Sequence, residues 1–208
     1  MKISLTDAGK RFNRDWIFRH LDFTFEQGRS YAITGPNGSG KSTLLQVIAG
    51  ALQVSEGQCR WSISEGSWVE EPYPYISICT PYLELVEEMN LQEFLHFHNG
   101  FKKFLPGMDT TAIIKRMGLE EAGHKQIRNF SSGMKQRVKL AQAIFSDVPA
   151  VFLDEPCTNL DTSGIDLYQQ LLNDHCRDRL LVVSSNDEVE YRYCKEQINI
   201  VDYKPPTP

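Results

Sequence analysis

The sequence predicts an α/β fold with a mostly parallel central sheet, an N-terminal antiparallel β subdomain and an inserted helical subdomain. Residues 1–28 alternate polar and apolar side chains, which is typical of half-exposed antiparallel strands. Residues 150–153 and 180–183 are continuous apolar runs, as expected for strands buried on both faces of a parallel sheet. Residues 83–128 change to helical periodicity, and 208 residues suffice for one domain with such an insertion.

The first 81 residues alternate strand patterns with one helix pattern. Short apolar runs bounded by glycine, proline and serine indicate buried strands, and a longer periodic run indicates a helix. The predicted elements are, in order, a strand at 30–34, a helix at 43–49 that Gly50 ends, a strand at 57–63, a turn at 64–67 and an inner strand at 75–79 that stops before Pro81.

The helical region carries four phenylalanines at spacings of three, four and three: Phe94, Phe97, Phe101 and Phe104. This spacing places them along one face of a helix. We interpret the face as core packing of a helical lobe, and an exposed docking face is the alternative. A second amphipathic helix is predicted at 110–117.

The second half of the chain repeats the alternation of helices and buried strands. Serine and aspartate side chains at helix starts can accept hydrogen bonds from free backbone amides. The predicted elements are a helix capped by Ser131 or Ser132, a strand at 150–153, a helix capped by Asp161, a strand at 180–183, a helix at 188–194, a strand at 198–201 and a loose tail at 205–208.

A phosphate-binding loop lies between the strand at 30–34 and the helix that follows it. The loop fits the pattern G-x-x-x-x-G-K-[ST] and comprises Gly35, Pro36, Asn37, Gly38, Ser39, Gly40, Lys41, Ser42 and Thr43. Glycines allow backbone N–H groups to point at phosphate oxygens, and the helix N-terminus adds a favourable dipole. Lys41 is predicted to contact the β- and γ-phosphates, and Ser42 is predicted to ligate Mg²⁺. The loop therefore predicts nucleotide binding.

Two acids follow the apolar strand at 150–153. At the carboxyl edge of a parallel sheet, Asp154 would meet the Mg²⁺ beside the phosphate loop. Glu155 is predicted to orient or polarise the attacking water. An ordinary strand end with two solvated acids is the alternative, and the phosphate loop upstream makes it much less favoured.

Four motifs lie in order along nearly the whole chain. They are the S-G-K-S-T of the phosphate loop, the segment Asn129-Phe130-Ser131-Ser132-Gly133-Met134-Lys135-Gln136-Arg137-Val138, the strand end Leu153-Asp154-Glu155-Pro156 and the loop Asn159-Leu160-Asp161. Together they resemble the motifs of ATP-binding-cassette (ABC) ATPases. The second is similar to the family's signature segment and the last to its D-loop. Free N–H groups at a helix start suit a γ-phosphate whatever the family.

The resemblance implies a P-loop NTPase core and one ABC ATPase domain over residues 1–208. Residues 1–81 and 138–204 would form the RecA-like core with the β subdomain, and 82–137 the helical subdomain that ends in the signature. The resemblance also implies a head-to-tail dimer of two copies with two ATP molecules between them. In that dimer Ser131, Ser132 and Gly133 contact the nucleotide that the second copy holds.

An aromatic side chain that stacks on adenine is a further expectation. Phe12 is similar in placement to the family's adenine-stacking residue, and Trp16 is the competing candidate. An aromatic face contributes affinity and discriminates little among purines. The alternative is that Phe12 is a strand residue that packs inward.

The chain departs from the family's pattern at several positions. The family usually has a glutamine after the strand at 75–79, where this chain has Thr80-Pro81-Tyr82, and a histidine where it has Asn186. Asparagine can donate a hydrogen bond to phosphate and cannot carry a proton near neutral pH. The signature has Ser132 and Met134 where glycine and glutamine are usual. We therefore predict ATP hydrolysis that is slow in isolation, with Asn186, Lys41 and Glu155 as catalytic residues.

Composition limits partners and location. The formal net charge is −5 without a basic run, so no nucleic-acid partner is expected. The 5 cysteines are scattered, which suits a reducing cytosol. The first residues lack the apolar core of a signal peptide, and no stretch reaches membrane-spanning length. We expect a cytoplasmic protein that is peripheral at the inner face of the cell membrane through a partner subunit.

The leading prediction of function is the ATP-binding subunit of a transporter, driving a separate integral membrane permease. The chain is similar to short stand-alone cassettes, including the haem-exporter type. The alternative is a soluble ABC-type ATPase switch that acts on a partner outside the membrane. The signature and the L-D-E-P strand end disfavour a small-molecule kinase.

Overall fold

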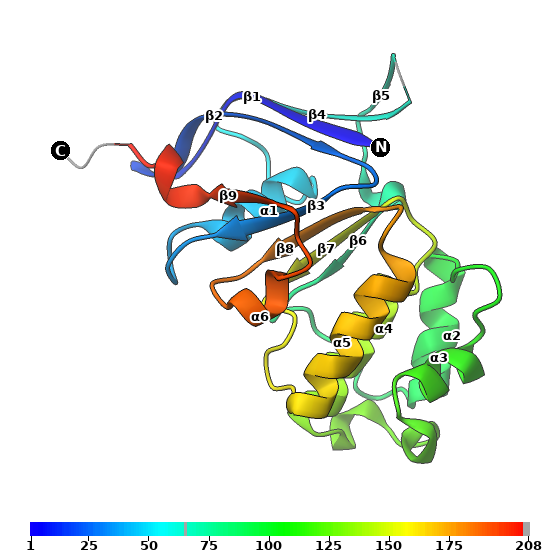
Figure 1. Cartoon of the computed structure of the whole chain (residues 1–208). Helices are drawn as coiled ribbons and strands as arrows, with labels where there is room; N and C mark the ends of the chain where they lie inside the picture. The colour runs from blue at the N-terminus through cyan, green and yellow to red at the C-terminus, as the bar shows by residue number, and fades with distance from the viewer. Residues whose placement is uncertain (65, 206–208) are drawn as a thin grey trace.

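The structure, a computed structural model, describes residues 1–64 and 66–205 and contains two sheets with helices around them (Figure 1). The larger sheet has five strands in the order β6-β7-β8-β3-β9, and every neighbouring pair is parallel. Its strands are β3 (Ser30–Thr34), β6 (Ile76–Cys79), β7 (Ala150–Asp154), β8 (Leu180–Ser184) and β9 (Glu196–Asn199). The predicted parallel α/β sheet is confirmed.

The smaller sheet is antiparallel and has the order β2-β1-β4-β5. It consists of β1 (Lys2–Phe12), β2 (Asp15–Glu26), β4 (Glu56–Ser64) and β5 (Ser67–Val69). Helix α1 (Lys41–Ile48) lies between the two sheets in Figure 1. It begins two residues before the predicted start at residue 43. The predicted turn at 64–67 joins β4 to β5, and its residue 65 lies outside the described residues.

Alternation along the buried strands divides the core between the two faces of the parallel sheet. Phe152 and Val182 pack with α1 and with the inward side chains of the N-terminal sheet. Val151 and Val183 point the other way and pack with the helices. All four side chains are buried, and each contributes about 1.5–3 kcal/mol by leaving water. The continuous apolar runs follow from this covering on both sides.

Besides α1, the described residues form the α-helices α2 (Leu91–Phe101), α3 (Thr110–Arg116), α4 (Ser132–Ile144), α5 (Thr162–His175) and α6 (Glu188–Tyr191). They also form the 3₁₀ helices η1 (Tyr73–Tyr75), η2 (Glu120–Ala122), η3 (Ile127–Asn129) and η4 (Ile200–Tyr203). Ser131, not Ser132, caps α4, because its hydroxyl accepts from the Met134 amide. Asp161 caps α5 as predicted. The proposed subdomain boundary after residue 137 falls inside α4, and the division stays a prediction.

The prediction that the four phenylalanines pack into the core is partly wrong. Phe94 is buried on α2, but the inward stripe continues through His98, which stacks on Phe104 beyond the end of the helix. Phe97 and Phe101 lie to one side of this stripe, 45% and 75% exposed, with ring centroids 4.9 Å apart. The spacing placed them on one face, but that face is wider than the surface that the core covers.

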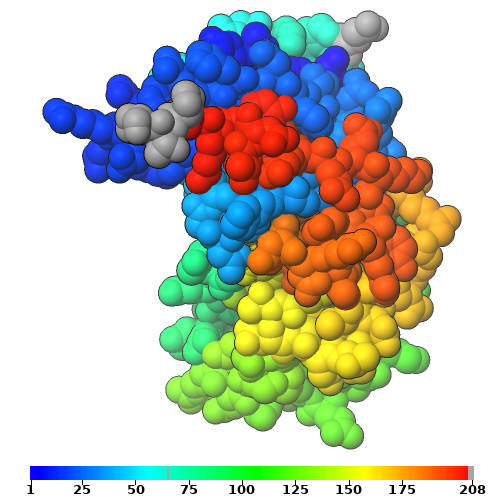
Figure 2. Space-filling view, turned by 60° about the vertical axis from the view of Figure 1, so that its left-hand side comes forward, coloured from blue at the N-terminus to red at the C-terminus, as the bar shows by residue number. Residues whose placement is uncertain are grey.

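The C-terminal elements also differ from the prediction. Helix α6 ends at Tyr191, three residues early, and the last strand ends at Asn199. The Asn199 side chain accepts from the Val201 amide and starts η4, so Ile200 and Val201 are not in a strand. Figure 2 shows this segment, in red, against the N-terminal strands in blue. Of the predicted loose tail, residues 206–208 lie outside the described residues.

Candidate nucleotide site

The phosphate loop joins β3 to α1 through glycines in left-handed conformations. Gly35, Gly38 and Gly40 have φ of 142°, 74° and 108°. Two of them also touch neighbouring elements: a Cβ at Gly35 would lie 2.9 Å from Ile200 Cγ2, and one at Gly40 would overlap Ile17 Cγ2. Only glycine satisfies both the backbone and the space at these two positions.

Helix α1 begins with its N-terminal amides free of side-chain caps. Its N-cap residue is Gly40, which has no side chain to accept from them. Lys41, 5% exposed, donates from Nζ to the carbonyl oxygens of Gly35 (2.9 Å) and Pro36 (3.2 Å). The ammonium group is therefore held against the loop that precedes it, with half-buried Ser42 next along the helix. This arrangement suits an anion at the helix start.

Strand register brings the phosphate loop and the two acids to one edge of the sheet. Ser184 of β8 pairs with Ile33 of β3 on one side and with Asp154 of β7 on the other. Asp154 is 2% exposed, and its Oδ1 has no hydrogen-bond partner among the described residues. A buried carboxylate oxygen without a partner is costly and fits a cation. Asp154 therefore fits Mg²⁺, as Ser42 does by its place at the loop.

Glu155 has a left-handed backbone with φ of 44°. This conformation costs a non-glycine residue about 1–2 kcal/mol. The Glu155 amide donates to the carbonyl oxygen of Ser184 at 2.9 Å, so the turn out of β7 is fixed to the end of β8. Asn186 lies two residues after Ser184, in the loop that leaves β8, and is exposed. The structure thus brings the acids and Asn186 to adjacent strand ends.

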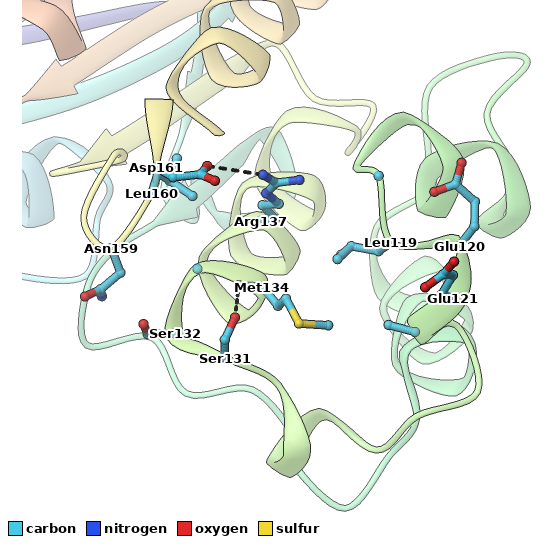
Figure 3. A pocket seen from close by; sticks show the side chains of 13 residues that line it. Leu119, Glu120, Glu121, Ser131, Ser132, Met134, Arg137, Asn159, Leu160 and Asp161 are labelled. Atoms are coloured by element: carbon cyan, nitrogen blue, oxygen red, sulfur yellow. Dashed lines mark hydrogen bonds and ion pairs between the residues drawn. The ribbon is translucent and has the colours of Figure 1, made fainter. Parts of the chain in front are cut away.

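The signature segment lines a cavity of about 910 Å³ (Figure 3). The cavity is lined by Gly118, Leu119, Glu120, Glu121, Ala122, Ser131, Ser132, Gly133, Met134, Arg137, Asn159, Leu160 and Asp161. Its described walls thus come from the segment after α3, from the start of α4 and from the loop before α5. The signature residues and the phosphate loop are not brought together here.

Arg137 ties the signature helix to the walls of this cavity. Its guanidinium donates to the carbonyl oxygen of Met117 (3.2 Å), to Ser163 Oγ (3.1 Å) and to Asp161 Oδ1 (3.4 Å), the last drawn in Figure 3. The Gly164 amide and the Ser163 hydroxyl, with Arg137 beside them, hold the pKa of the Asp161 carboxyl below its usual range. These contacts of Arg137 join residues far apart in the sequence, and the signature motif alone does not predict them.

Phe12 and Trp16 lie in different surroundings. Phe12, at the end of β1, is 46% exposed, with Lys10 Nζ 5.2 Å from its ring centroid. Trp16 is half-buried on β2, with the guanidinium groups of Arg19 and Arg11 at 4.6 and 5.5 Å from its ring. Phe12 has the more accessible face, and the alternative of an inward-packed Phe12 does not hold.

The segment that replaces the expected glutamine is tethered to α4. Lys139 Nζ donates to the carbonyl oxygen of Pro81 at 2.7 Å. Tyr82 beside it is 85% exposed. Gln136, 3% exposed, donates from Nε2 to the carbonyl oxygen of Pro156 at 2.7 Å, so α4 also holds the turn after β7. Neither contact is predicted by a local sequence pattern.

A left-handed phosphate loop at a helix start, beside strand-end acids of a parallel sheet, defines a nucleotide-binding α/β protein. The sequence profile of the ABC transporter family matches residues 18–158. The cytochrome c biogenesis ATP-binding export protein CcmA of Xylella fastidiosa is 32% identical over 159 residues, which are 76% of this chain and 71% of that protein. This chain therefore belongs to the ABC transporter family.

Two solved structures share the fold. An ABC transporter ATP-binding protein from Pyrococcus furiosus, described as putative, has a TM-score of 0.81 at 20% identity and covers 99% of this chain and 100% of its own. A dimeric bacterial ABC transporter cassette has a TM-score of 0.80 at 20% identity, with 95% and 94% covered.

The family membership gives the chain its activity. It is the ATP-binding subunit of an ABC transporter and an ATPase. Cassettes of this family dimerise and pair with membrane subunits. Within residues 1–64 and 66–205, no helix combines the length and the apolar character needed to cross a membrane.

Replacement of Gly40 tests the loop. We expect Gly40→Ala to abolish ATP binding, because the new Cβ overlaps Ile17 and the backbone is left-handed. Isothermal titration with ATP would measure the affinity. Gly107→Ala is the matched control, since Gly107 also has a positive φ of 79° but has nothing within 4 Å of a Cβ. Normal ATP affinity in Gly40→Ala would contradict the geometry.

Replacement of the two aromatics separates their roles. We expect Phe12→Ala to weaken ATP binding by about 1 kcal/mol, the size of one stacking contact, and to leave the melting temperature nearly unchanged. Trp16→Ala should lower the melting temperature, because Trp16 packs under two arginines. The opposite assignment of the two effects would make Trp16 the adenine-stacking residue.

Proposed function

We propose that this chain hydrolyses ATP as one half of a head-to-tail homodimer and thereby drives a membrane permease. The observation that carries the proposal is the position of the signature. Ser131, Ser132 and Gly133 line a cavity whose described walls come from other segments than the phosphate loop. Each signature is then free to meet the nucleotide on the loop of a second copy, as the family resemblance implies.

Within each site the residues divide the chemistry. Lys41 and the loop amides hold the β- and γ-phosphates, and Ser42 and Asp154 hold Mg²⁺, which supplies charge neutralisation when bound. Glu155 orients the attacking water and polarises it. Asn186 donates a hydrogen bond to the γ-phosphate.

Hydrolysis is slow in the isolated chain. Asn186 cannot take up a proton near neutral pH as a histidine would, and the Pro81 segment offers no glutamine side chain to the site. Lys139 holds the segment Thr80-Pro81-Tyr82 through the Pro81 carbonyl oxygen, and the Tyr82 side chain of this segment is exposed on the surface. A partner that contacts this surface can therefore raise the rate.

The permease docks beside the same segment. A groove of about 470 Å³ includes Tyr73, Ile76, Leu83 and His98 in its lining. Phe101, the residue before the groove-lining Lys102, is exposed at the end of α2, and exposed aromatic side chains of this kind mark protein interfaces. We propose a cytoplasmic segment of the permease as the occupant, which makes the chain peripheral at the inner face of the cell membrane.

The relatives suggest the direction of transport. The Xylella fastidiosa protein is named an export protein of cytochrome c biogenesis. We propose that this chain likewise powers export in that process, as a cassette of the haem-exporter type.

Two variants test the proposed site. We expect Lys41→Ala to lose ATP binding and turnover, and Glu155→Gln to keep ATP binding and lose at least about 99% of turnover, as expected for loss of a catalytic carboxylate. Size-exclusion chromatography of Glu155→Gln in ATP should show a dimer that is absent in ADP. A Glu155→Gln chain with normal turnover would refute the catalytic role, and a monomer in ATP would refute the sandwich.

A charge in the aromatic patch tests the partner. Phe101→Glu should leave the ATPase rate and the stability of the isolated chain unchanged, because Phe101 is 75% exposed. Stimulation of the ATPase by native membranes should be lost. Val201→Glu, at a 42% exposed position on η4, should keep the stimulation. Stimulation by a soluble fraction instead of membranes would favour the soluble-switch function.

A further inference from the structure

Two hydrogen bonds tie the turn after β7 to the segment after β8. The first joins the Glu155 amide to the Ser184 carbonyl oxygen at 2.9 Å. The second joins the Cys157 amide to Glu190 Oε1 at 2.7 Å. Pro156 between them has no N–H to donate, so the Cys157 amide is the next donor of this turn after Glu155. The side chain of Glu190 therefore holds the far end of a turn that begins at Glu155.

Glu190 is itself held firmly. It lies on α6 and is 5% exposed. Its own carbonyl oxygen accepts from the hydroxyl of Tyr168 at 2.7 Å, and Tyr168 is wholly buried on α5. The backbone of α6 at Glu190 is thus anchored to α5, and from this anchored position the buried carboxylate reaches the Cys157 amide.

The position is an expensive one for a carboxylate. Burial raises the pKa of Glu190. The Ser185 hydroxyl and the Cys157 amide act against this shift, and the neighbouring carboxylates of Asp187 and Glu155 add to it. Glu190 Oε2 is buried without a hydrogen-bond partner among the described residues. An apolar side chain would avoid this desolvation, but it could not accept from the Cys157 amide.

The turn needs such a restraint because Glu155 is strained. Its φ of 44° is uncommon outside glycine, and strained backbones persist only where their surroundings over-determine them. With both ends of the turn bonded to the β8–α6 segment, the backbone that carries the Glu155 side chain is held in place relative to Asn186 on the same segment.

The same bond restrains the loop that follows. The Thr158 amide donates to the Glu155 carbonyl oxygen and the Leu160 amide to that of Cys157. The same loop lies close to the signature segment, because a Cβ added to Gly133 would be only 2.9 Å from the carbonyl oxygen of Asn159. Cys157 is thus bonded both to Glu190 and to Leu160, which lines the signature cavity.

We propose that Glu190 is a positioning residue of the ATPase reaction: by accepting from the Cys157 amide, its carboxylate fixes Glu155 relative to the loop that carries Asn186. The inference rests on the proposed role of Glu155. It predicts that turnover depends on a hydrogen-bond acceptor at position 190, and that ATP affinity, which the phosphate loop provides, does not.

Kinetics of Glu190→Met and Glu190→Gln in the full chain test the proposal. Methionine fills the space and offers no comparable acceptor, so kcat should fall by about tenfold or more, the effect of a small misplacement of a catalytic group. KM for ATP should change by less than about twofold, because the phosphate loop is elsewhere. Glutamine keeps an Oε1 acceptor and should recover most of kcat. Glu188→Gln, exposed on the same helix, is the control.

Two further variants keep the result interpretable. Tyr168→Phe removes only the hydroxyl that donates to the backbone carbonyl oxygen of Glu190. The loss should loosen α6 beneath the carboxylate and lower kcat in the same direction, so this variant replaces Glu190→Met if that chain does not fold. An unchanged kcat in the folded methionine chain, or an equal loss in the glutamine chain, would overturn the inference. Glu155→Gln is measured alongside: if its turnover is normal the proposed function fails, whereas loss there with a normal Glu190→Met refutes Glu190 alone.

Discussion

The parallel pairing of β8 with both β3 and β7 is the interaction on which the nucleotide site depends. Because Ser184 is in register with Ile33 and with Asp154, the phosphate loop and the strand-end acids emerge from neighbouring strands at one edge. In a parallel sheet a slip of one residue would turn Asp154 to the opposite face and move its carboxylate away from the loop. The apolar side chains on both faces of these strands fix the register, so the core determines the geometry of the site.

Helix α4 is the second organising element, through its polar side chains. Lys139 holds the Pro81 carbonyl oxygen, Gln136 that of Pro156 and Arg137 that of Met117. Each carbonyl belongs to a different loop. The helix that starts with the signature therefore restrains the segment after β6, the turn after β7 and the segment after α3 together. Through Gln136 and the Pro156 carbonyl oxygen, the helix that begins at the signature is bonded to the turn that carries Glu155.

The sequence was sufficient for features that are local or periodic, and insufficient for those set by distant partners. The phosphate loop and the strands β7 and β8 have patterns within a few residues, and the structure has them where the patterns predicted. The exposure of Phe101 depends on which surfaces the core covers, and the end of β9 depends on the Asn199 cap. The periodicity of the sequence predicts neither. The bond between Cys157 and Glu190 joins residues 33 apart in the sequence. The left-handed backbone at Glu155 was not predicted, because a glycine is the usual sequence signal for this conformation.

The contact between Ile200 and Gly35 has a consequence for biosynthesis. Strand β3, which leads into the phosphate loop, lies between β8 and β9, and Ile200 of η4 lies against the loop itself. A nascent chain therefore carries its phosphate loop outside the ribosome long before the residues that complete it have been synthesised. The loop reaches its native surroundings only when residues 196–203 are in place. Folding around the nucleotide site is thus completed only after translation has passed these residues.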